Sequence, residues 1–188
     1  MTERDVAGTL VVSATRAEAN YVPPGTRLLI TGIGKVRAAT VLTRELVAAQ
    51  TGAAEPVTEV INIGTAGALH DHHSGLFVPS TVIEHDISSD ALRAMGYDIV
   101  DTHQFDGDGS VLATGDTFIA DPVARAELSR RADLVDMEGA AIAYVCASFG
   151  VDLTVVKAVS DGADEQATDW PSLVDAAALD LGRWLAAR

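Results

Sequence analysis

The sequence has few of the residues from which a disulfide or a nucleic-acid surface is usually built. Cys146 is the one cysteine among 188 residues, so no internal disulfide can form and a reducing compartment is the simplest expectation. The chain has 13 lysines and arginines against 27 aspartates and glutamates, which gives a net charge of −14. This charge argues against partners held mainly through phosphate groups, namely DNA, RNA and anionic membrane surfaces.

Aromatic residues are also scarce, at 5%, so alanine, valine, leucine and isoleucine must form the core. Hydrophobic residues still make up 48% of the chain, which argues against disorder. No apolar run has the length of a membrane span or the form of a signal peptide. We therefore expect a cytosolic protein with no membrane partner and one domain over residues 1–188.

Short β-branched runs alternate along the chain with alanine-rich helical segments. Strands are predicted over 9–14, 27–31, 59–63, 76–87, 111–114, 134–137 and 153–160. Helices are predicted over 35–50, 138–149 and 170–187, with Gly52 and Gly150 as stop signals. Pro79 indicates an edge or a bulge, and 88–108 is predicted as a loop or a short helix. The alternation predicts an α/β fold with a largely parallel sheet between helical layers.

Two glycine-rich segments follow predicted strands. The segment 31–35 (TGIGK) does not fit a dinucleotide-binding turn, because Arg37 stands where the third glycine belongs. It does not fit a P-loop either, since Leu29 and Val36 occupy the defining positions, so a tight turn before a helix is at least as good an interpretation. The segment 64–67 (GTAG) is interpreted as a turn at a strand end, where small residues let a ligand approach the backbone.

Histidines cluster in one short segment, 70–73 (HDHH). Adjacent histidines rarely converge on one ion and no matching ligand set stands elsewhere, so we interpret the segment as a solvated loop and predict no metal site. The polar pair His85-Asp86 follows a strand and has either a functional role or a turn-capping role.

Three acids lie at the ends of predicted strands or just beyond them: Glu18, Glu138 and Asp161. Each alone is well explained as a surface acid, a first-turn acid or a cap. Together they would converge on one side of the sheet, which raises the hypothesis of a site there. Lys35 and Lys157 are the only lysines, and both fall in segments of interest, although chance explains this as well as a need for an amine.

Six segments in order along the chain carry a resemblance to a known family. They are 11–18 (VVSATRAE), 31–38 (TGIGKVRA), 60–69 (VINIGTAGAL), His85-Asp86, 114–119 (TGDTFI) and 134–164 (LVDMEGAAIAYVCASFGVDLTVVKAVSDGAD). With them the chain resembles the 5′-methylthioadenosine/S-adenosylhomocysteine nucleosidases, within the nucleoside phosphorylase/hydrolase superfamily. The resemblance implies a three-layer phosphorylase/hydrolase-like α/β fold with a central mixed, largely parallel sheet. It also implies hydrolysis of an adenine nucleoside in methionine salvage, without a cofactor or metal ion.

The resemblance assigns catalytic roles to two acids and a binding role to a third. Asp161 would protonate N7 of adenine, Glu18 would orient and deprotonate the attacking water, and Glu138 would bind the ribose hydroxyls. The further substrate-binding residues are Met137 on the sugar, Phe118 and Ile119 on the base, Ser160 in support of Asp161, and Thr65, Gly67 and Lys157, the last where the family usually has arginine. The resemblance further implies a homodimer in which the partner helps to close the pocket around the 5′ substituent.

The chemistry is consistent with these roles. Adenine is a poor leaving group as an anion, so a carboxylic acid that protonates N7 helps it to leave. A second carboxylate activates the attacking water, and glycoside hydrolases use a pair of carboxylates in the same way. An acid at position 161 also pairs with both the N6–H donor and the N7 acceptor of adenine, which favours adenine over hypoxanthine and disfavours a futalosine-type substrate.

Three alternatives stay open. A phosphate-dependent phosphorylase would need cations such as Arg16 or Lys35 to hold the anion, and Glu18 would repel it. A futalosine-type hydrolase would act on a 6-oxo purine, which presents two acceptors to the acid at position 161. A non-catalytic nucleoside-binding protein could share the fold, although binding adenine does not require Glu18. The chain is short at 20–25 and 88–108 relative to the family, and these segments normally shape the 5′ pocket, so the 5′ specificity is open.

Overall fold

The computed structural model describes residues 8–164 and 170–188. The strands are β1 (Thr9–Ser13), β2 (Leu28–Ile30), β3 (Glu59–Ala68), β4 (Leu76–Phe77), β5 (Thr81–Glu84), β6 (Thr102–Gln104), β7 (Val111–Thr114), β8 (Leu134–Asp136) and β9 (Asp152–Asp161). The helices are α1 (Lys35–Gln50), α2 (Ser89–Ala94), α3 (Pro122–Leu128), α4 (Gly139–Phe149) and α5 (Trp170–Ala186).

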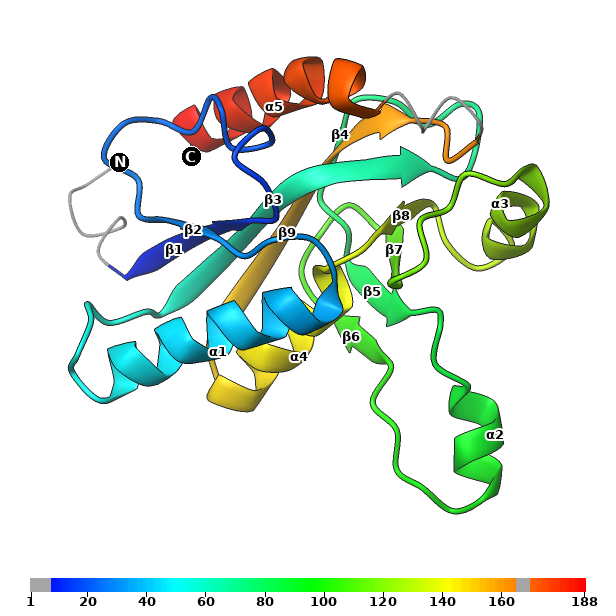
Figure 1. Cartoon of the computed structure of the whole chain (residues 1–188), viewed down its shortest axis with the longest axis horizontal. Helices are drawn as coiled ribbons and strands as arrows, with labels where there is room; N and C mark the ends of the chain where they lie inside the picture. Colours follow the sequence, from blue (N-terminus) through cyan, green and yellow to red (C-terminus); the bar gives the residue numbers. More distant parts are fainter. Residues whose placement is uncertain (1–7, 165–169) are drawn as a thin grey trace.

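The described strands form one nine-stranded sheet made of two parallel blocks, with β4 and β6 added antiparallel to β9 and β5 (Figure 1). In the first block β2, β1, β3 and β9 run in parallel, and in the second β5, β7 and β8 do. The blocks are joined where the end of β3 pairs antiparallel with β8, through Gly67 with Val135 and Ala68 with Leu134. The carboxyl ends of strands from both blocks therefore meet near this junction, the place where α/β sheets bind ligands.

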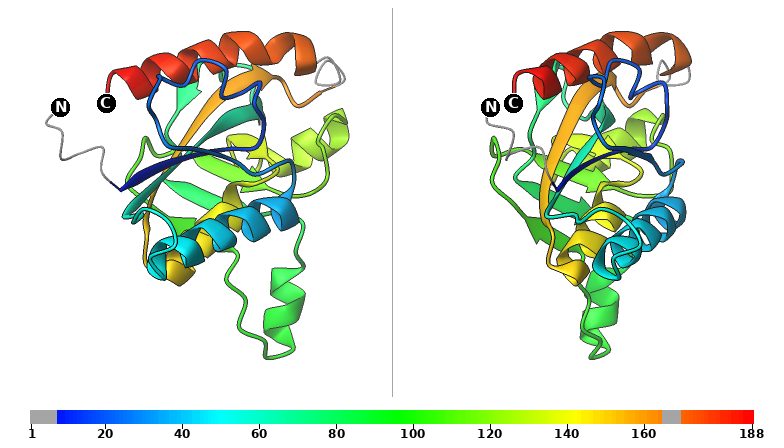
Figure 2. Two further views of the ribbon diagram at one scale, coloured as in Figure 1. Left: turned by 60° about the vertical axis from the view of Figure 1, so that its left-hand side comes forward. Right: turned by 90° about the vertical axis from the view of Figure 1, so that its left-hand side faces the viewer.

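Helices cover both faces of the first block, which gives three layers (Figures 1 and 2). On one face α1 and α4 bury Leu42, Leu46 and Ile142 against β1 and β3. On the other face α5 buries Ala177 and Leu181 against β3 and β9. Because apolar aliphatic side chains fill both interfaces, the few aromatic residues are not needed for the core.

The predicted fold class, a three-layer α/β fold with a mixed, largely parallel sheet, is confirmed. The predicted helix over 35–50 has those bounds as α1, since Gly34 precedes it at φ 95° and Gly52 lies just beyond it. Helix α4 ends as predicted at Gly150, which takes the left-handed conformation with φ 65° that glycine adopts without strain.

Two predictions for strand ends are wrong. The segment 64–67 is no turn, because β3 continues through it to Ala68. Its small residues pair with β9 along almost the whole strand, and this pairing outweighs the local preference of glycine for turns. The single strand predicted over 76–87 is divided into β4 and β5 with Pro79 between them, and β5 lies inside the sheet between β7 and β6.

The segment 88–108 contains a short helix, α2, and the edge strand β6; β6 pairs with β5 in the sheet, whereas α2 and the chain on either side of it form an arm that projects from the body of the molecule (Figures 1 and 2). The closing helix α5 begins as predicted and ends one residue earlier, at Ala186. None of the helices in the described ranges is long and apolar enough to cross a membrane.

Candidate active site

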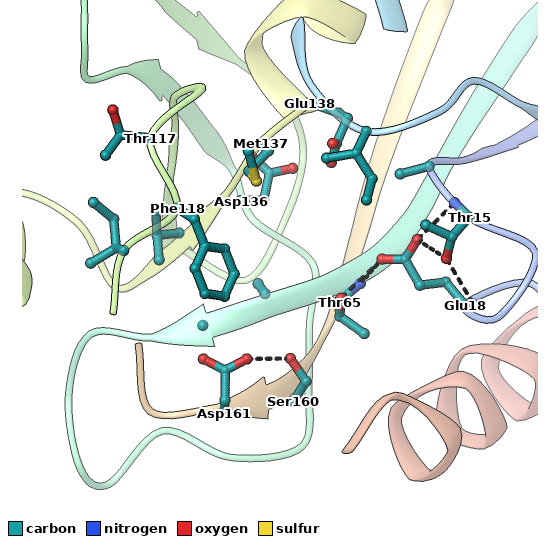
Figure 3. A pocket seen from close by; sticks show the side chains of 16 residues that line it. Thr15, Glu18, Thr65, Thr117, Phe118, Asp136, Met137, Glu138, Ser160 and Asp161 are labelled. Atoms are coloured by element: carbon teal, nitrogen blue, oxygen red, sulfur yellow. Dashed lines mark hydrogen bonds between the residues drawn. The ribbon is translucent and has the colours of Figure 1, made fainter. Parts of the chain in front are cut away.

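A cavity of about 240 Å³ opens at the junction of the two strand blocks (Figure 3). Its walls come from the loop after β1, the loop before α1, the end of β3, the loop after β7, the β8–α4 junction and the end of β9. Nine of the ten predicted site residues line it: Glu18, Thr65, Gly67, Phe118, Ile119, Met137, Glu138, Ser160 and Asp161. The fold thus brings together residues that are up to 143 positions apart (161 − 18) in the sequence.

Glu18 is a buried carboxylate whose oxygens accept hydrogen bonds from two directions (Figure 3). Thr65 donates to Oε1 from its backbone N–H at 2.8 Å and from its hydroxyl at 2.9 Å. Thr15 donates to Oε2 from its N–H at 3.0 Å and its hydroxyl at 2.8 Å. These four donors fix the carboxylate at the cavity wall, and the hydroxyl at position 65 is one of them.

Asp161 lies at the end of β9, where a register shift against β3 places it opposite Gly67. Its Oδ2 accepts from the Ser160 hydroxyl at 2.6 Å (Figure 3). Its Oδ1 accepts from the Ala163 N–H at 2.9 Å. A Cβ at position 67 would lie 3.2 Å from Oδ1 of Asp161 and 2.9 Å from the Ala163 side chain. Gly67 therefore leaves room for the carboxyl group of Asp161.

Glu138 sits just before α4, and its Oε1 accepts from the Gly34 N–H at 2.7 Å. The side chain is buried, and Asp136 is close to it. Burial and the charge of Asp136 raise the pKa of Glu138 from 4.5 to about 7, although Lys157 and the Gly34 N–H partly oppose the shift. Glu138 therefore changes charge near neutral pH.

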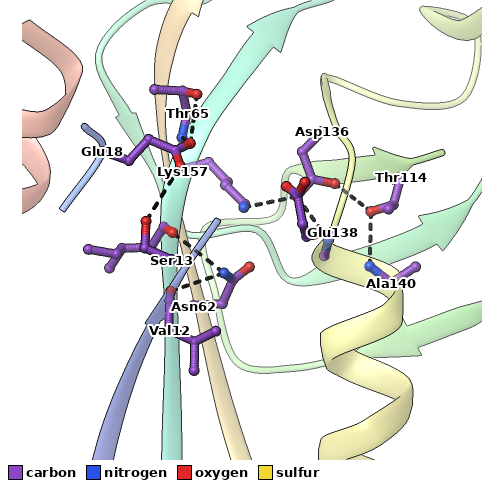
Figure 4. Close-up of polar contacts among 12 residues, drawn as sticks. Val12, Ser13, Glu18, Asn62, Thr65, Thr114, Asp136, Glu138, Ala140 and Lys157 are labelled. Atoms are coloured by element: carbon purple, nitrogen blue, oxygen red, sulfur yellow. Dashed lines mark hydrogen bonds and ion pairs between the residues drawn. The ribbon is translucent and has the colours of Figure 1, made fainter. Parts of the chain in front are cut away.

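Lys157 does not line the cavity, so its predicted direct contact with substrate is not supported by its position. Its Nζ lies 2.9 Å from Oδ2 of Asp136, and both side chains are at most 2% exposed (Figure 4). A Cβ at Gly64 would lie 3.1 Å from this Nζ and 3.2 Å from Oε1 of Glu18, so the ammonium group lies behind the cavity near both acids. Burial alone would lower the pKa of Lys157, but the charges of Asp136 and Glu138 raise it.

Asp136 is a cavity residue that the sequence reasoning missed. It accepts from the Thr114 hydroxyl at 2.5 Å, from the Gly139 N–H at 2.9 Å and from Lys157 (Figure 4). Thr114 in turn accepts from the Ala140 N–H at 2.9 Å. An acid inside the short apolar strand LVD was the available signal, since a buried carboxylate needs partners of this kind.

The loop after β7 supplies the other side of the cavity. Phe118 is 50% exposed with its ring at the cavity, whereas Ile119 is buried beside it. Met137, between Asp136 and Glu138 in the sequence, also lines the cavity. Ile33 joins it from the loop before α1, so the cavity presents apolar side chains as well as acids to a ligand.

The remaining sequence motifs lie outside this cavity. The rings of His70, His72 and His73 are 4.4 to 5.6 Å apart, and Nε2 of His70 and of His73 each lies 3.9 Å from Oδ1 of Asp133. Within residues 8–164 and 170–188, no group of three or more histidine, cysteine or acidic side chains is arranged to hold a metal ion. Arg16 is exposed and does not line the cavity.

Known proteins resemble this chain in sequence and in fold. Residues 109–183 match the sequence profile of the Phosphorylase superfamily. The 5′-methylthioadenosine/S-adenosylhomocysteine nucleosidase of a Shewanella species is 31% identical over 192 residues, which cover 87% of this chain and 77% of that protein. The aminodeoxyfutalosine nucleosidase of Helicobacter pylori is 34% identical over 99 residues, which cover 52% of this chain and 42% of that one.

The fold match extends over almost the whole chain. The crystal structure of the Helicobacter pylori 5′-methylthioadenosine/S-adenosylhomocysteine nucleosidase superposes with a TM-score of 0.80 at 23% identity, covering 97% of both chains. The sequence alignments with the first curated relatives span about half of those proteins, between 42% and 54%.

The sheet, the cavity at its junction and these matches define a member of the Phosphorylase superfamily. Within this superfamily, the chain belongs to the 5′-methylthioadenosine/S-adenosylhomocysteine nucleosidase family.

The raised pKa of Glu138 predicts a pH-dependent stability. Between pH 4.5 and about 7 the folded protein holds a proton on Glu138 that the unfolded chain has lost, so the free energy of unfolding falls as the pH rises through this range. Glu138→Gln removes the titration but keeps an oxygen that can accept from Gly34. We expect this variant to be ~1–3 kcal/mol more stable than the wild type near pH 8 and to lose most of that advantage near pH 4, in urea denaturation.

The control for this experiment is Glu127→Gln, because Glu127 is an acid whose side chain is 71% exposed. Its effect on the free energy of unfolding should be small over the same range. A Glu138→Gln effect of constant size across the pH range would contradict the prediction.

Proposed function

We propose that this protein hydrolyses the N-glycosidic bond of an adenine nucleoside of the 5′-methylthioadenosine or S-adenosylhomocysteine type and releases adenine. The observation that carries the proposal is the convergence of Glu18, Glu138 and Asp161 on one cavity. The family of the chain supports the same reaction, because its relatives are named as nucleosidases.

Asp161 is the proposed general acid. Its carboxyl group is fixed by Ser160 and Ala163 at the cavity wall, with Gly67 leaving it room. As the bond between C1′ and N9 breaks, Asp161 would deliver a proton to N7 and so neutralise the charge that builds on the purine. A carboxyl group facing N7 can also accept from the 6-amino group, which favours adenine as the leaving base.

Glu18 is the proposed general base. The water oxygen would bond to C1′ while Glu18 takes the proton that this water loses, and the electrons of the broken bond leave with adenine. Thr15 and Thr65 hold the carboxylate in one orientation, which reduces the entropy cost of aligning the water. Transfer of one proton from Glu18 to Asp161 through solvent then restores both groups.

Glu138 is proposed to accept hydrogen bonds from the ribose hydroxyls, with Met137 packed on the sugar. The Gly34 N–H occupies one of its oxygens and leaves acceptor capacity toward the cavity. Phe118 would stack on the adenine ring, and the Ile119 backbone would read the edge of the base. Lys157 would act from behind the cavity, through the charges of Asp136 and Glu138.

Water is favoured over phosphate as the nucleophile by the charge of the cavity. Among the residues that the structure describes, the lining includes four acids, Glu18, Asp136, Glu138 and Asp161, and no lysine or arginine. Arg16 is exposed away from the lining, and the Lys35 amine is bound to Glu84 and Asp86. A phosphate ion would therefore meet negative charge without a compensating cation in contact.

The group at the 5′ carbon is left to experiment. Relatives of this chain are named for methylthioadenosine, S-adenosylhomocysteine and aminodeoxyfutalosine, so all three nucleosides belong in the substrate panel. No residue of the segments 20–25 and 88–108 lines the cavity, so these segments do not enclose it.

The nucleophile is tested by incubating the purified protein with methylthioadenosine, with and without inorganic phosphate. We expect adenine and free methylthioribose in equal amounts at a rate that phosphate does not change. A strict requirement for phosphate would replace the hydrolase by a phosphorylase. Binding without turnover of any of the three nucleosides would favour the non-catalytic binding protein.

Variants test the roles of the two proposed catalytic acids. Asp161→Asn and Glu18→Gln should each lower kcat by ~10²–10⁴-fold while the nucleoside still binds, because each removes a proton transfer from the transition state. Steady-state kinetics and calorimetry measure the two effects. Asp180→Asn, at a surface acid of α5 whose side chain is 47% exposed, should leave kcat unchanged. Wild-type turnover by Asp161→Asn would refute the proposed mechanism.

We also propose that the protein is a homodimer, as the resemblance to its family implies. Ile33 is an exposed apolar side chain that lines the cavity, and the exposed side chains of Val36 and Tyr144 line a second hollow together with Lys35 of α1. Sedimentation equilibrium should give a mass twice 19.6 kDa. Val36→Glu, at a side chain that is 75% exposed, should shift the mass toward the monomer and raise KM. A fully active monomer would contradict this assembly.

A further inference from the structure

The first residue of α1 has an ammonium group bound by two acids at the end of β5. Nζ of Lys35 lies 2.6 Å from Oε1 of Glu84 and 2.6 Å from Oδ1 of Asp86, and the Lys35 side chain is 18% exposed. Burial alone would lower the pKa of Lys35, but its bonds to Asp86 and Glu84 raise it, so the amine stays charged. The partial burial and the two partners distinguish this contact from a solvated surface pair.

A third acid closes a ring of contacts around this lysine. Oδ1 of Asp116 accepts from the backbone N–H of Lys35 at 2.8 Å. The backbone N–H of Asp116 donates to Oδ2 of Asp86 at 2.8 Å, and Asp86 returns to the Lys35 amine through its other oxygen. Lys35, Asp86 and Asp116 thus connect the start of α1, the end of β5 and the loop after β7.

Each side of this ring continues directly into the cavity. Gly34, the neighbour of Lys35, donates its N–H to Glu138 at 2.7 Å. Asp116 is two positions before Phe118, which lines the opposite side. The loop before α1 and the loop after β7 come close together here, because a Cβ at Gly34 would lie 3.1 Å from Oδ1 of Asp116. Gly34 also has φ 95°. A glycine is needed at this position both for its backbone conformation and for the space.

We propose that Lys35 is a positioning residue that holds the loop of Phe118 and the Gly34 N–H in register, and so couples base binding to sugar binding. This inference rests on the proposed nucleosidase function. It gives a joint role to two motifs, the TGIGK segment and the His85-Asp86 pair, that otherwise look like unrelated turns. Lys35 touches neither the base nor the sugar, since it does not line the cavity.

The inference predicts a split between binding and chemistry. Lys35→Met keeps the stem and removes the charge, so the start of α1 loses its side-chain bonds to Glu84 and Asp86, while the backbone N–H at position 35 can still donate to Asp116. We expect the KM for methylthioadenosine to rise about tenfold while kcat changes less than about threefold, the pattern of lost uniform binding. Lys35→Arg should recover KM to within about threefold, because a guanidinium can still pair with the acids.

The matched control is Arg27→Met. Arg27 pairs with Glu45 of α1 at 2.7 Å with similar exposure, 27% and 28%, but far along the helix from the cavity. It should lower the melting temperature as much as Lys35→Met does and leave KM unchanged. An equal rise of KM in both variants would reduce Lys35 to a stability role and overturn the inference. Asp86→Asn provides a second variant of the ring and should raise KM like Lys35→Met.

Adenine binding by calorimetry separates this inference from the proposed function. Made alone, Lys35→Met should weaken adenine binding about tenfold. Made in the Phe118→Leu variant, it should weaken adenine binding less than about threefold, because both substitutions act on the contact between Phe118 and the base. Effects that multiply independently would overturn the coupling. If the wild type turns over nucleoside and Lys35→Met matches it in KM and adenine affinity, only this inference fails. If the wild type neither binds adenine nor cleaves a nucleoside, both proposals fall.

Discussion

The buried ion pair between Lys157 and Asp136 holds the candidate site together. It joins β9 of one strand block to β8 of the other, directly behind the cavity, and Asp136 also accepts from Thr114 and from Gly139 at the start of α4. Removing one partner of such a pair leaves an uncompensated charge and costs ~3–5 kcal/mol. The same two charges act in opposite directions on the neighbouring Glu138, so the pair also sets when that acid is ionised.

The convergence of three acids follows from the topology of the sheet. Glu18 follows β1, Asp161 ends β9 and Glu138 follows β8, and the first two strands belong to one parallel block while the third belongs to the other. Because β3 meets β8 in the antiparallel sense, the two blocks direct their carboxyl ends at the same place. Acids from both blocks can therefore reach one ligand that occupies the junction.

Local signals predicted what local interactions determine. The bounds of α1 and the end of α4 at Gly150 follow from side-chain periodicity and from glycine, and nine of ten site residues reach the cavity because their motifs sit at strand ends. The segment 64–67 belongs to β3 although its glycines predict a turn, because its conformation depends on pairing with β9, about 90 positions away (157 − 64 = 93). The sequence also did not predict the position of Lys157 behind the cavity or the role of Asp136. The alternation of side chains along a strand does not identify the residue of another strand that a side chain contacts.

The proposed general acid and the proposed base-stacking residue belong to different kinds of structure. Asp161 lies at the end of the long strand β9, whereas Ile33 and Phe118 lie in loops. Glu18 lies in the loop after β1, but Thr65 of β3 holds its carboxylate, so both proposed reacting groups are fixed to the sheet while the proposed recognition surface is carried by loops. A protein divided in this way is a favourable scaffold for loop grafting, since a new rim could be built for another nucleoside without moving the reacting groups.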